Sequence, residues 1–273
     1  MRQRMVLENL SPRTIVSYLN GPRQLIRYYN KPPEEITSDQ ILSYLVYLRE
    51  EKQQKRNTMR IAVNGIRYLY KHFLNRAEIC EQLPYPKAER YIPEVFTGAE
   101  LKRLFQGIKN QKHRVLLKLI YSAGLRRGEA CNILLSDIDT KNMQIRVRGG
   151  KGRRDRYVML SRHMLVELRS YIHNFWPRHY LFNGRKKGTP ITASCIRWAL
   201  CQALKREGLQ RGLNVHSLRH SFASHLLSMG VNLMVIRDLL GHQSILTTMI
   251  YLHINYRMKS DVINPLDKMF PVV

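Results

Sequence analysis

Hydrophobic residues recur at helical spacing through most of the chain. The clearest run in the first 83 residues follows the three- and four-residue steps of one helix face and comprises Met59, Ala62, Val63, Ile66, Leu69, Tyr70 and Phe73. Ser11 followed by Pro12 is typical of a helix start, and Thr37 with Gln40 has the spacing of a capping box. These signals predict three main helices and a short fourth.

Prolines interrupt the helical pattern after residue 83. The segment 83–97, LPYPKAERYIPEVFT, holds three prolines at spacings that a helix interior does not tolerate. We therefore expect a linker at residues 84–96, between a helical domain of residues 1–83 and a second domain of residues 97–273.

Helical spacing returns after the linker, with one change of period. Thr97 and Glu100 form another capping box, and residues 114–134 predict two helices with a break at Gly124. Residues 143–161, MQIRVRGGKGRRDRYVMLS, alternate apolar and polar positions on both sides of a glycine-rich turn, which predicts a β-hairpin around Gly149 to Gly152. Helices resume to the end. The predicted fold is mainly α with a small β-hairpin or sheet.

Charge narrows the choice of partner. The chain has 46 Lys and Arg against 20 Asp and Glu, a formal charge of +26, and such a surface attracts polyanions, nucleic acid above all. No stretch approaches the roughly 18 apolar residues of a membrane span, and the N-terminus lacks a signal-peptide core, so we expect a cytoplasmic protein. Residues 1–90 carry 16 basic and 9 acidic side chains (+7), and residues 91–273 carry 30 and 11 (+19). Two basic halves suit a clamp around duplex DNA.

The cysteines predict neither a disulfide framework nor a zinc module. The four of them lie far apart without a C-x-x-C pair, at Cys80, Cys131, Cys195 and Cys201. We interpret them as reduced packing residues.

The hairpin concentrates positive charge and allows two interpretations. Six basic residues and one acid, Asp155, fall within 11 positions, the basic ones being Arg146, Arg148, Lys151, Arg153, Arg154 and Arg156. One interpretation is a solvated hairpin that grips DNA without chemistry. The other selects Lys151, because Gly150 and Gly152 beside it allow the backbone to approach a phosphate closely.

A second concentration of chemistry lies in residues 212–227, GLNVHSLRHSFASHLL. His216, Arg219 and His220 are three and four residues apart near a helix start, so they share one face. Two histidines at this spacing can bind zinc, but Arg219 would repel a dication and no carboxylate has ligand spacing. A phosphate site is the better interpretation.

Five motifs in order resemble the tyrosine recombinase (phage integrase) family. They are YSAGLRRGEA with Arg126, GKGRRDR with Lys151, HSLRH with His216 and Arg219, LLGH with His242, and TTMIYLH with Tyr251. The resemblance covers nearly the whole chain and is closest to simple two-domain recombinases of the Xer-like and mobile-element type. It implies a helical, SAM-like core-binding domain and a mixed, mostly helical catalytic domain, together forming a C-shaped clamp on DNA.

The resemblance also implies a role for each motif residue. Arg126 and Arg219 match the paired arginines that bind the scissile phosphate, and Tyr251 matches the nucleophile. Lys151 matches the general acid, His216 an acid or base near the tyrosine, and His242 a second histidine on the phosphate. We expect contacts to the DNA backbone from Arg127, Arg148, Arg153 and Arg154.

Four neighbouring residues receive more ordinary interpretations. Glu129 follows the arginine motif and is expected to order the site rather than react. His220 and His225 are interpreted as structural or supporting residues, and His253 as packing near Tyr251 without reacting.

The implied reaction cleaves and rejoins DNA at specific sites through a 3′-phosphotyrosyl intermediate and a Holliday junction. Bond energy is kept in that intermediate, so ATP is not expected to be needed. The paired arginines take the place of the metal ion that many nucleases use, so no metal is expected. The family further implies a homotetramer on two duplexes, monomeric or weakly associated when free and present at the bacterial nucleoid.

Two rival functions and one segment stay open. A type IB topoisomerase would use the same tyrosine chemistry on one duplex, and a DNA-binding protein without catalysis would explain the charge alone. The tail, residues 254–273, includes apolar Val262, Ile263, Leu266, Met269 and Phe270. It either packs on its own domain or docks on a neighbouring subunit.

Overall fold

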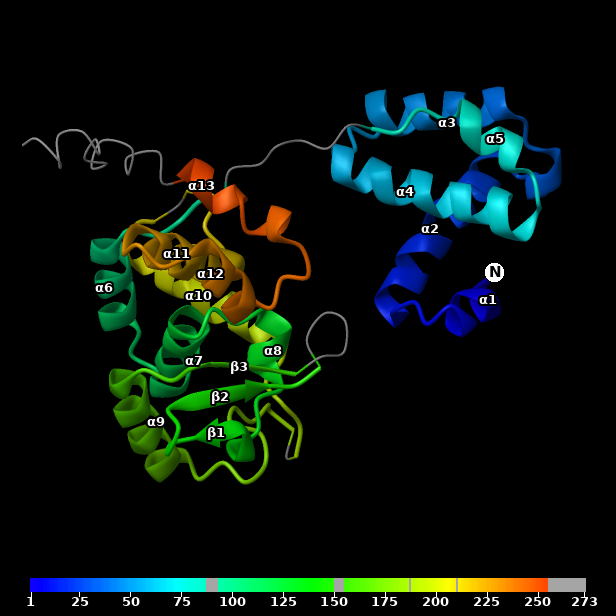
Figure 1. The fold of residues 1–273 in the computed structure, drawn as a ribbon. Coiled ribbons are helices and arrows are strands. Elements are labelled where there is room, and N and C mark those ends of the chain that lie inside the picture. Colours follow the sequence, from blue (N-terminus) through cyan, green and yellow to red (C-terminus); the bar gives the residue numbers. More distant parts are fainter. Residues whose placement is uncertain (87–92, 150–154, 187, 210, 255–273) are drawn as a thin grey trace, which may run out of the picture. The chain divides into compact units, whose positions relative to one another are not determined.

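The structure, a computed structural model, describes residues 1–86, 93–149, 155–186, 188–209 and 211–254 (Figure 1). The chain divides into two compact units, Met1–Tyr91 and Ile92–Val273. Within the described ranges, the helices are all too short or too polar to span a bilayer.

The first unit is helical. Its helices are α1 (Arg2–Leu7), α2 (Pro12–Tyr29), α3 (Ser38–Glu50), α4 (Arg56–Tyr68) and α5 (Ala77–Gln82), with a 3-10 turn at Pro33–Glu35. The Ser11 hydroxyl caps α2 and the predicted capping box of Thr37 and Gln40 begins α3, so both start signals are confirmed. In its described part, the unit has two short helices, α1 and α5, instead of the one predicted, since α1 forms before the Ser11 cap.

One predicted core position of this unit is wrong. Helix α4 continues into a π-helical turn, Leu69–Phe73, in which more residues are needed per turn than in an α-helix. The stripe that begins at Met59 therefore rotates away from the core at its end, and Phe73 is 56% exposed while Leu69 and Tyr70 stay buried.

The second unit contains eight α-helices among its described residues. They are α6 (Gly98–Gly107), α7 (Gln111–Ser122), α8 (Arg127–Cys131), α9 (Arg162–Phe175), α10 (Ala193–Arg206), α11 (Val215–Ser228), α12 (Leu233–Leu240) and α13 (Ile250–Ile254), with 3-10 turns at Leu135–Asp137 and Ile245–Thr247. The predicted capping box of Thr97 and Glu100 begins α6. The predicted break at Gly124 is confirmed: its φ is +58°, and a Cβ there would lie 2.5 Å from the Phe222 ring.

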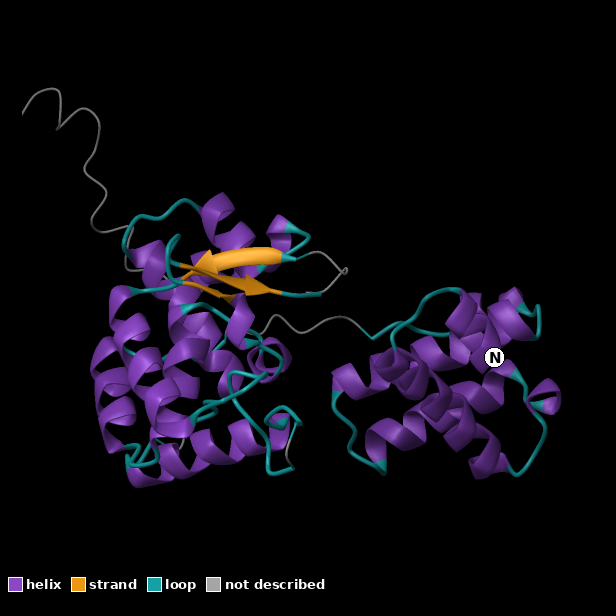
Figure 2. Ribbon diagram, turned by 90° about the horizontal axis from the view of Figure 1, so that it is seen from below, coloured by secondary structure: helices purple, strands orange, loops and turns teal. Residues whose placement is uncertain are grey.

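A small antiparallel sheet lies along one side of this helical body (Figures 1 and 2). Its strands, in the order β1-β2-β3, are Ile138–Asp139, Gln144–Val147 and Arg156–Met159. The predicted hairpin is confirmed as β2 and β3, paired from Gln144 with Met159 to Val147 with Arg156, and β1 adds a third strand that was not predicted. Residues 150–154 of the turn lie outside the described residues.

Helix α11 contributes side chains to two hydrophobic clusters of the second unit. Its Leu218 belongs to the main core of the unit, whereas its Phe222 and Ala223 pack in a second cluster with Ile236 and Leu240 of α12. Tyr251 of α13 is buried in that same cluster. One hydrophobic cluster therefore holds helices α11, α12 and α13 together.

Candidate active site

A pocket of about 310 Å³ lies where α11, the end of α12 and α13 meet the loop before α8. Five of the predicted catalytic residues line it, namely Arg126, His216, Arg219, His242 and Tyr251. His220, Gly241, Gln243, Ser244, Thr247 and Ile250 complete the lining. Lys151, Arg153 and Arg154 lie outside the described residues. Side chains from positions 125 residues apart are thus brought to one cavity.

Tyr251 is almost completely buried. The residue is 1% exposed, and its hydroxyl lies 3.0 Å from Nδ1 of His220. Burial raises the pKa of the phenol to about 12, although the positive charges of Arg219 and Arg126 act in the opposite direction. The hydroxyl is therefore protonated at neutral pH and must lose its proton before or during any attack on phosphorus.

His220 is placed to accept that proton. Burial, with the nearby charges of His216 and Arg219, lowers the pKa of the His220 ring to about 4. A ring that is neutral at pH 7 has one nitrogen free to accept a hydrogen bond. The sequence predicts a structural or supporting role for His220, and in the structure this histidine directly contacts Tyr251.

The two arginines of the pocket are fixed by main-chain carbonyls. Arg219 is 3% exposed and donates from Nη1 to the Gly124 oxygen and from Nη2 to the Leu240 oxygen, both at 2.6 Å. Arg126 donates from Nη2 to the Gly241 oxygen at 2.9 Å. A guanidinium has five N–H groups, so each arginine keeps donors for a ligand in the pocket while its orientation is set.

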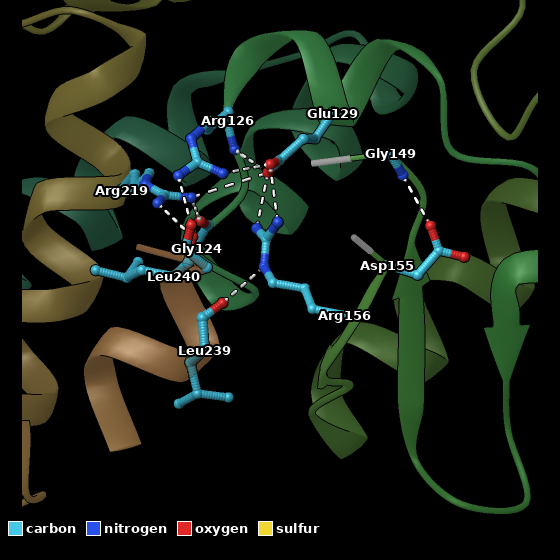
Figure 3. A network of polar contacts seen from close by, with 10 residues as sticks. Gly124, Arg126, Glu129, Gly149, Asp155, Arg156, Arg219, Leu239 and Leu240 are labelled. Atoms are coloured by element: carbon cyan, nitrogen blue, oxygen red, sulfur yellow. Dashed lines mark hydrogen bonds and ion pairs between the residues drawn. The ribbon is translucent and has the colours of Figure 1, made fainter. Parts of the chain in front are cut away.

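The Glu129 carboxylate is the common partner of Arg126, Arg156 and Arg219 (Figure 3). Its carboxylate accepts from Nη1 and the backbone N–H of Arg126, each at 2.7 Å, and from both terminal nitrogens of Arg156 at 2.8 Å. Arg219 Nη1 is 3.8 Å away. Burial alone would raise the pKa of Glu129, but the hydrogen bonds and charges of Arg156 and Arg126 outweigh burial and lower it to about 2. Glu129 is therefore a permanent anion, which suits an ordering role.

The other two histidines of the pocket are also neutral at pH 7. His242 directly follows Gly241, and its Nδ1 lies 2.9 Å from the hydroxyl of buried Thr248. Burial and the charges of Arg219 and Arg126 lower its pKa to about 3. Desolvation and the same two arginines, with Arg127, also lower the pKa of His216. Neutral imidazoles can donate one hydrogen bond to a phosphate without adding charge.

The described candidates for DNA contact differ in their present partners. Arg148 donates from Nε to Asp137 at 2.6 Å, so part of its guanidinium is already engaged. Arg127 is half-buried and close enough to His216 to affect that ring's pKa, yet it does not line the pocket. Over the described part of the chain, no three His, Cys, Asp or Glu side chains are grouped to hold a metal ion.

The sequence predicts only a structural or supporting role for His220 and no role for Arg156 beyond the charge of the hairpin, although each residue had a further signal. His220 is four residues after His216 on the same helix face, so the pattern that selected one histidine applied to both. Arg156 is two residues before buried Val158 on β3, so the two side chains share the inner face of the strand. An arginine at an inward position requires a buried partner, and Glu129 provides it.

Comparison with known families accounts for nearly all of the described chain. The model described as "Phage integrase family" matches residues 94–258, and the one described as "Phage integrase, N-terminal SAM-like domain" matches residues 1–78.

Curated relatives and solved structures agree with the family models. The chain is 31% identical over 274 residues to a "Tyrosine recombinase" of Pseudothermotoga lettingae, covering 96% of this chain and 94% of the relative. It is 34% identical over 251 residues to "Tyrosine recombinase XerA" of Thermococcus kodakarensis, covering 90% and 86%. A crystal structure of XerA recombinase superposes with a TM-score of 0.57 at 27% identity, covering 100% and 97%. XerH bound to its difH substrate has a similar fold, with a TM-score of 0.75 at 22% identity, covering 93% and 79%.

Proposed function

The chain belongs to the phage integrase family, and from its pocket we propose how the tyrosine recombination reaction is divided among its residues. The protein is a site-specific DNA recombinase whose partner is DNA. The observation that carries the assignment of roles is the buried Tyr251 hydroxyl, 3.0 Å from a neutral histidine and in the same pocket as two fixed arginines.

Tyr251 is the nucleophile. Its phenolic oxygen attacks the scissile phosphorus and forms a 3′-phosphotyrosyl bond, while the bond from phosphorus to the 5′ oxygen breaks. The phenolic proton passes to Nδ1 of His220, which its low pKa keeps neutral at pH 7. A phenol is a better leaving group than an alkoxide, so a 5′-hydroxyl of another strand can later reverse the step.

Arg126 and Arg219 bind the non-bridging oxygens of the phosphate. Their remaining N–H donors open into the pocket, and their charge meets the negative charge that grows on phosphorus during attack. His242 and His216 line the same cavity as neutral hydrogen-bond donors. The acid or base role that the resemblance implies for His216 is here proposed for His220, four residues later on the same helix.

Lys151 is proposed as the acid that protonates the departing 5′ oxygen. The proposal rests on the motif GKGRRDR, since residues 150–154 lie outside the described residues. The described strands β2 and β3 flank this turn, and Arg156 at the start of β3 contacts Glu129 of the site.

The rest of the reaction scheme follows from the chemistry of a transesterification. Each cleaved phosphodiester is replaced by a phosphotyrosine, so rejoining needs no ATP, and the arginines take the charge-neutralising role that a metal ion has in many nucleases. We propose that exchange proceeds through a Holliday junction in a homotetramer on two duplexes. Residues 1–83 would act as the core-binding domain and residues 97–273 as the catalytic domain, both carrying the positive charge that phosphate contact requires.

The assignment of the nucleophile is tested by Tyr251→Phe. A duplex nicked near the cleavage site traps the covalent adduct, because the short 5′ fragment diffuses away. The variant should form no adduct while binding the site with nearly wild-type affinity, since only one oxygen atom is lost. Arg211→Gln is a suitable control, because this exposed arginine pairs with Glu100 and does not line the pocket. An adduct of undiminished yield with Tyr251→Phe would refute the assignment.

A further inference from the structure

Three arginines bind the carbonyl end of α12, and one of them has no role in the scheme above. The last carbonyls of a helix lack partners within it and carry the negative end of its dipole. Here three consecutive carbonyls each accept from a different arginine: Leu239 from Arg156, Leu240 from Arg219 and Gly241 from Arg126. His242 follows directly. The backbone that leads to His242 and Tyr251 is thus fixed by arginines from three separate parts of the chain.

Arg156 differs from the other two arginines in its position. Among the described residues that line the pocket, Arg126 and Arg219 are the only arginines, and Arg156 is not part of the lining. Figure 3 shows its guanidinium in contact with the Glu129 carboxylate. It comes from β3, and its side chain is 11% exposed. It makes a two-pronged contact with Glu129 and a third hydrogen bond, from Nε to the Leu239 oxygen at 3.0 Å. Two of the contacts reach Glu129, which also binds Arg126, and the third reaches Leu239, whose neighbours Leu240 and Gly241 bind Arg219 and Arg126.

The end of α12 is shaped to receive this side chain. Gly241 has a φ of +62°, and a Cβ there would lie 2.8 Å from Cδ of Arg156. Any larger residue would be strained by its backbone conformation and would also push against the arginine stem. The close approach indicates that Arg156 is packed in one defined orientation rather than spread over the surface.

Arg156 also determines the charge that the site presents. Among the described groups, Arg126, Arg156 and Arg219 bring three positive charges and Glu129 one negative charge, a net charge of +2 for these four side chains. The neighbouring His220 and His242 are neutral before the phenolic proton is transferred. A phosphodiester under attack by a phenolate carries two negative charges. Without Arg156 the net charge would fall to +1, and Glu129 would lie beside the reacting phosphate with less of its charge neutralised.

We propose that Arg156 is a positioning residue for strand cleavage, which neutralises Glu129 and holds the end of α12 so that Arg126 and Arg219 meet the phosphate in a fixed orientation. The inference rests on the proposed function of the pocket. It joins the strand that follows the Lys151 turn to the phosphate site, since one side chain of β3 contacts both Glu129 and α12.

The test compares two variants on two substrates. Arg156→Gln removes the charge but keeps an N–H donor for Glu129, and Arg156→Lys keeps the charge but loses the two-pronged contact. Adduct formation is timed at saturating protein on nicked DNA with an ordinary scissile phosphate, and on the same DNA with a methylphosphonate, which lacks the negative charge. Wild-type protein and Tyr251→Phe are run first, so that a failure of the proposed function is recognised separately.

We expect Arg156→Gln to be about 10²-fold slower than wild type on the phosphate and only about tenfold slower on the methylphosphonate. Arg156→Lys should be about tenfold slower than wild type on both substrates, because the charge is kept but the two-pronged contact with Glu129 is lost. Arg211→Gln should match wild type, since this arginine also pairs with a carboxylate and a main-chain carbonyl but away from the pocket.

Two results would overturn the proposal: a folded Arg156→Gln that cleaves at the wild-type rate, or one that loses the same factor on both substrates. Thermal unfolding and DNA affinity establish that each variant is folded. If Arg156→Gln does not fold, Arg156→Lys decides alone. A wild-type rate then overturns the proposal, and a loss confined to cleavage, with Tm and DNA affinity unchanged, supports it.

Discussion

Two histidines of helix α11 each contact a tyrosine of another helix, and the two pairs are alike in geometry. Nδ1 of His220 lies 3.0 Å from the Tyr251 hydroxyl, and Nδ1 of His225 lies 3.0 Å from the Tyr121 hydroxyl. Burial lowers the pKa of both histidines and raises the pKa of both tyrosines. By contact alone, either pair could be a nucleophile with its base.

The difference between the pairs lies in the charges around them. Arg219 and Arg126 act on the phenol of Tyr251 and line its pocket, whereas burial alone shifts the pKa of Tyr121. The Tyr121 ring packs against Phe105 and Phe222 instead. If Tyr251 is the nucleophile as proposed, a hydrogen bond to a neutral histidine is not enough to make a tyrosine reactive, and a phosphate-binding site beside the hydroxyl is also required.

Replacing the forked guanidinium of Arg219 should have the largest effect on the cleavage rate. Arg219→Lys keeps a positive charge, but an ammonium cannot bond the Gly124 and Leu240 carbonyls and two phosphate oxygens at once. We expect cleavage to slow by about 10³-fold, as for the loss of a preorganised transition-state donor. Single-turnover adduct formation on nicked DNA measures this rate.

The matched control for that change is Arg237→Lys. Arg237 lies on α12 and pairs with its neighbour Asp238, outside the pocket lining. Its replacement should leave the cleavage rate within about twofold, as for an exposed ion pair. Near-normal cleavage by Arg219→Lys would mean that charge without geometry suffices, and the phosphate-binding role would have to be abandoned.

The two histidine–tyrosine pairs also show which features of the site could be predicted from the sequence and which could not. The helical spacing, the capping boxes, the break at Gly124 and the hairpin all depend on local patterns, and the structure confirms them. The motifs selected five residues that meet in one pocket. They could not assign a partner to each histidine, because Tyr121 is 104 residues from His225 and Tyr251 is 31 from His220. Such pairings are decided by how α7 and α13 pack on α11, which no local pattern encodes.

Replacing the histidine of each pair should sharpen the contrast through pH. His220→Asn removes the proton acceptor but keeps a polar group near Nδ1, and we expect cleavage at pH 7 to slow by about 10²-fold. Wild-type cleavage should be nearly flat from pH 6 to 9, because His220, with a pKa of about 4, is already neutral there. The variant must wait for tyrosinate, whose fraction rises about tenfold per pH unit below the phenol pKa of about 12.

His225→Asn provides the control on the same helix. Its rate and its pH profile should follow wild type, since the Tyr121 pair lies outside the pocket lining. A flat pH profile for His220→Asn would contradict the role of His220 as proton acceptor and return that role to His216. The measurement is the adduct rate across the pH range at saturating protein, with DNA affinity checked at each end.

The smallest effect is expected at the second tyrosine. Tyr121→Phe removes the hydroxyl that His225 contacts and leaves the ring in its apolar surroundings, so it should lower the free energy of unfolding by about 1 kcal/mol. For a unit of this size the loss corresponds to a fall in Tm of about 2–4 °C. Cleavage by the folded variant should stay at the wild-type rate. An equal slowing of cleavage by Tyr121→Phe and His220→Asn would mean that a change anywhere along α11 alters the pocket. The pocket arginines would then no longer explain why Tyr251, and not Tyr121, is the proposed nucleophile.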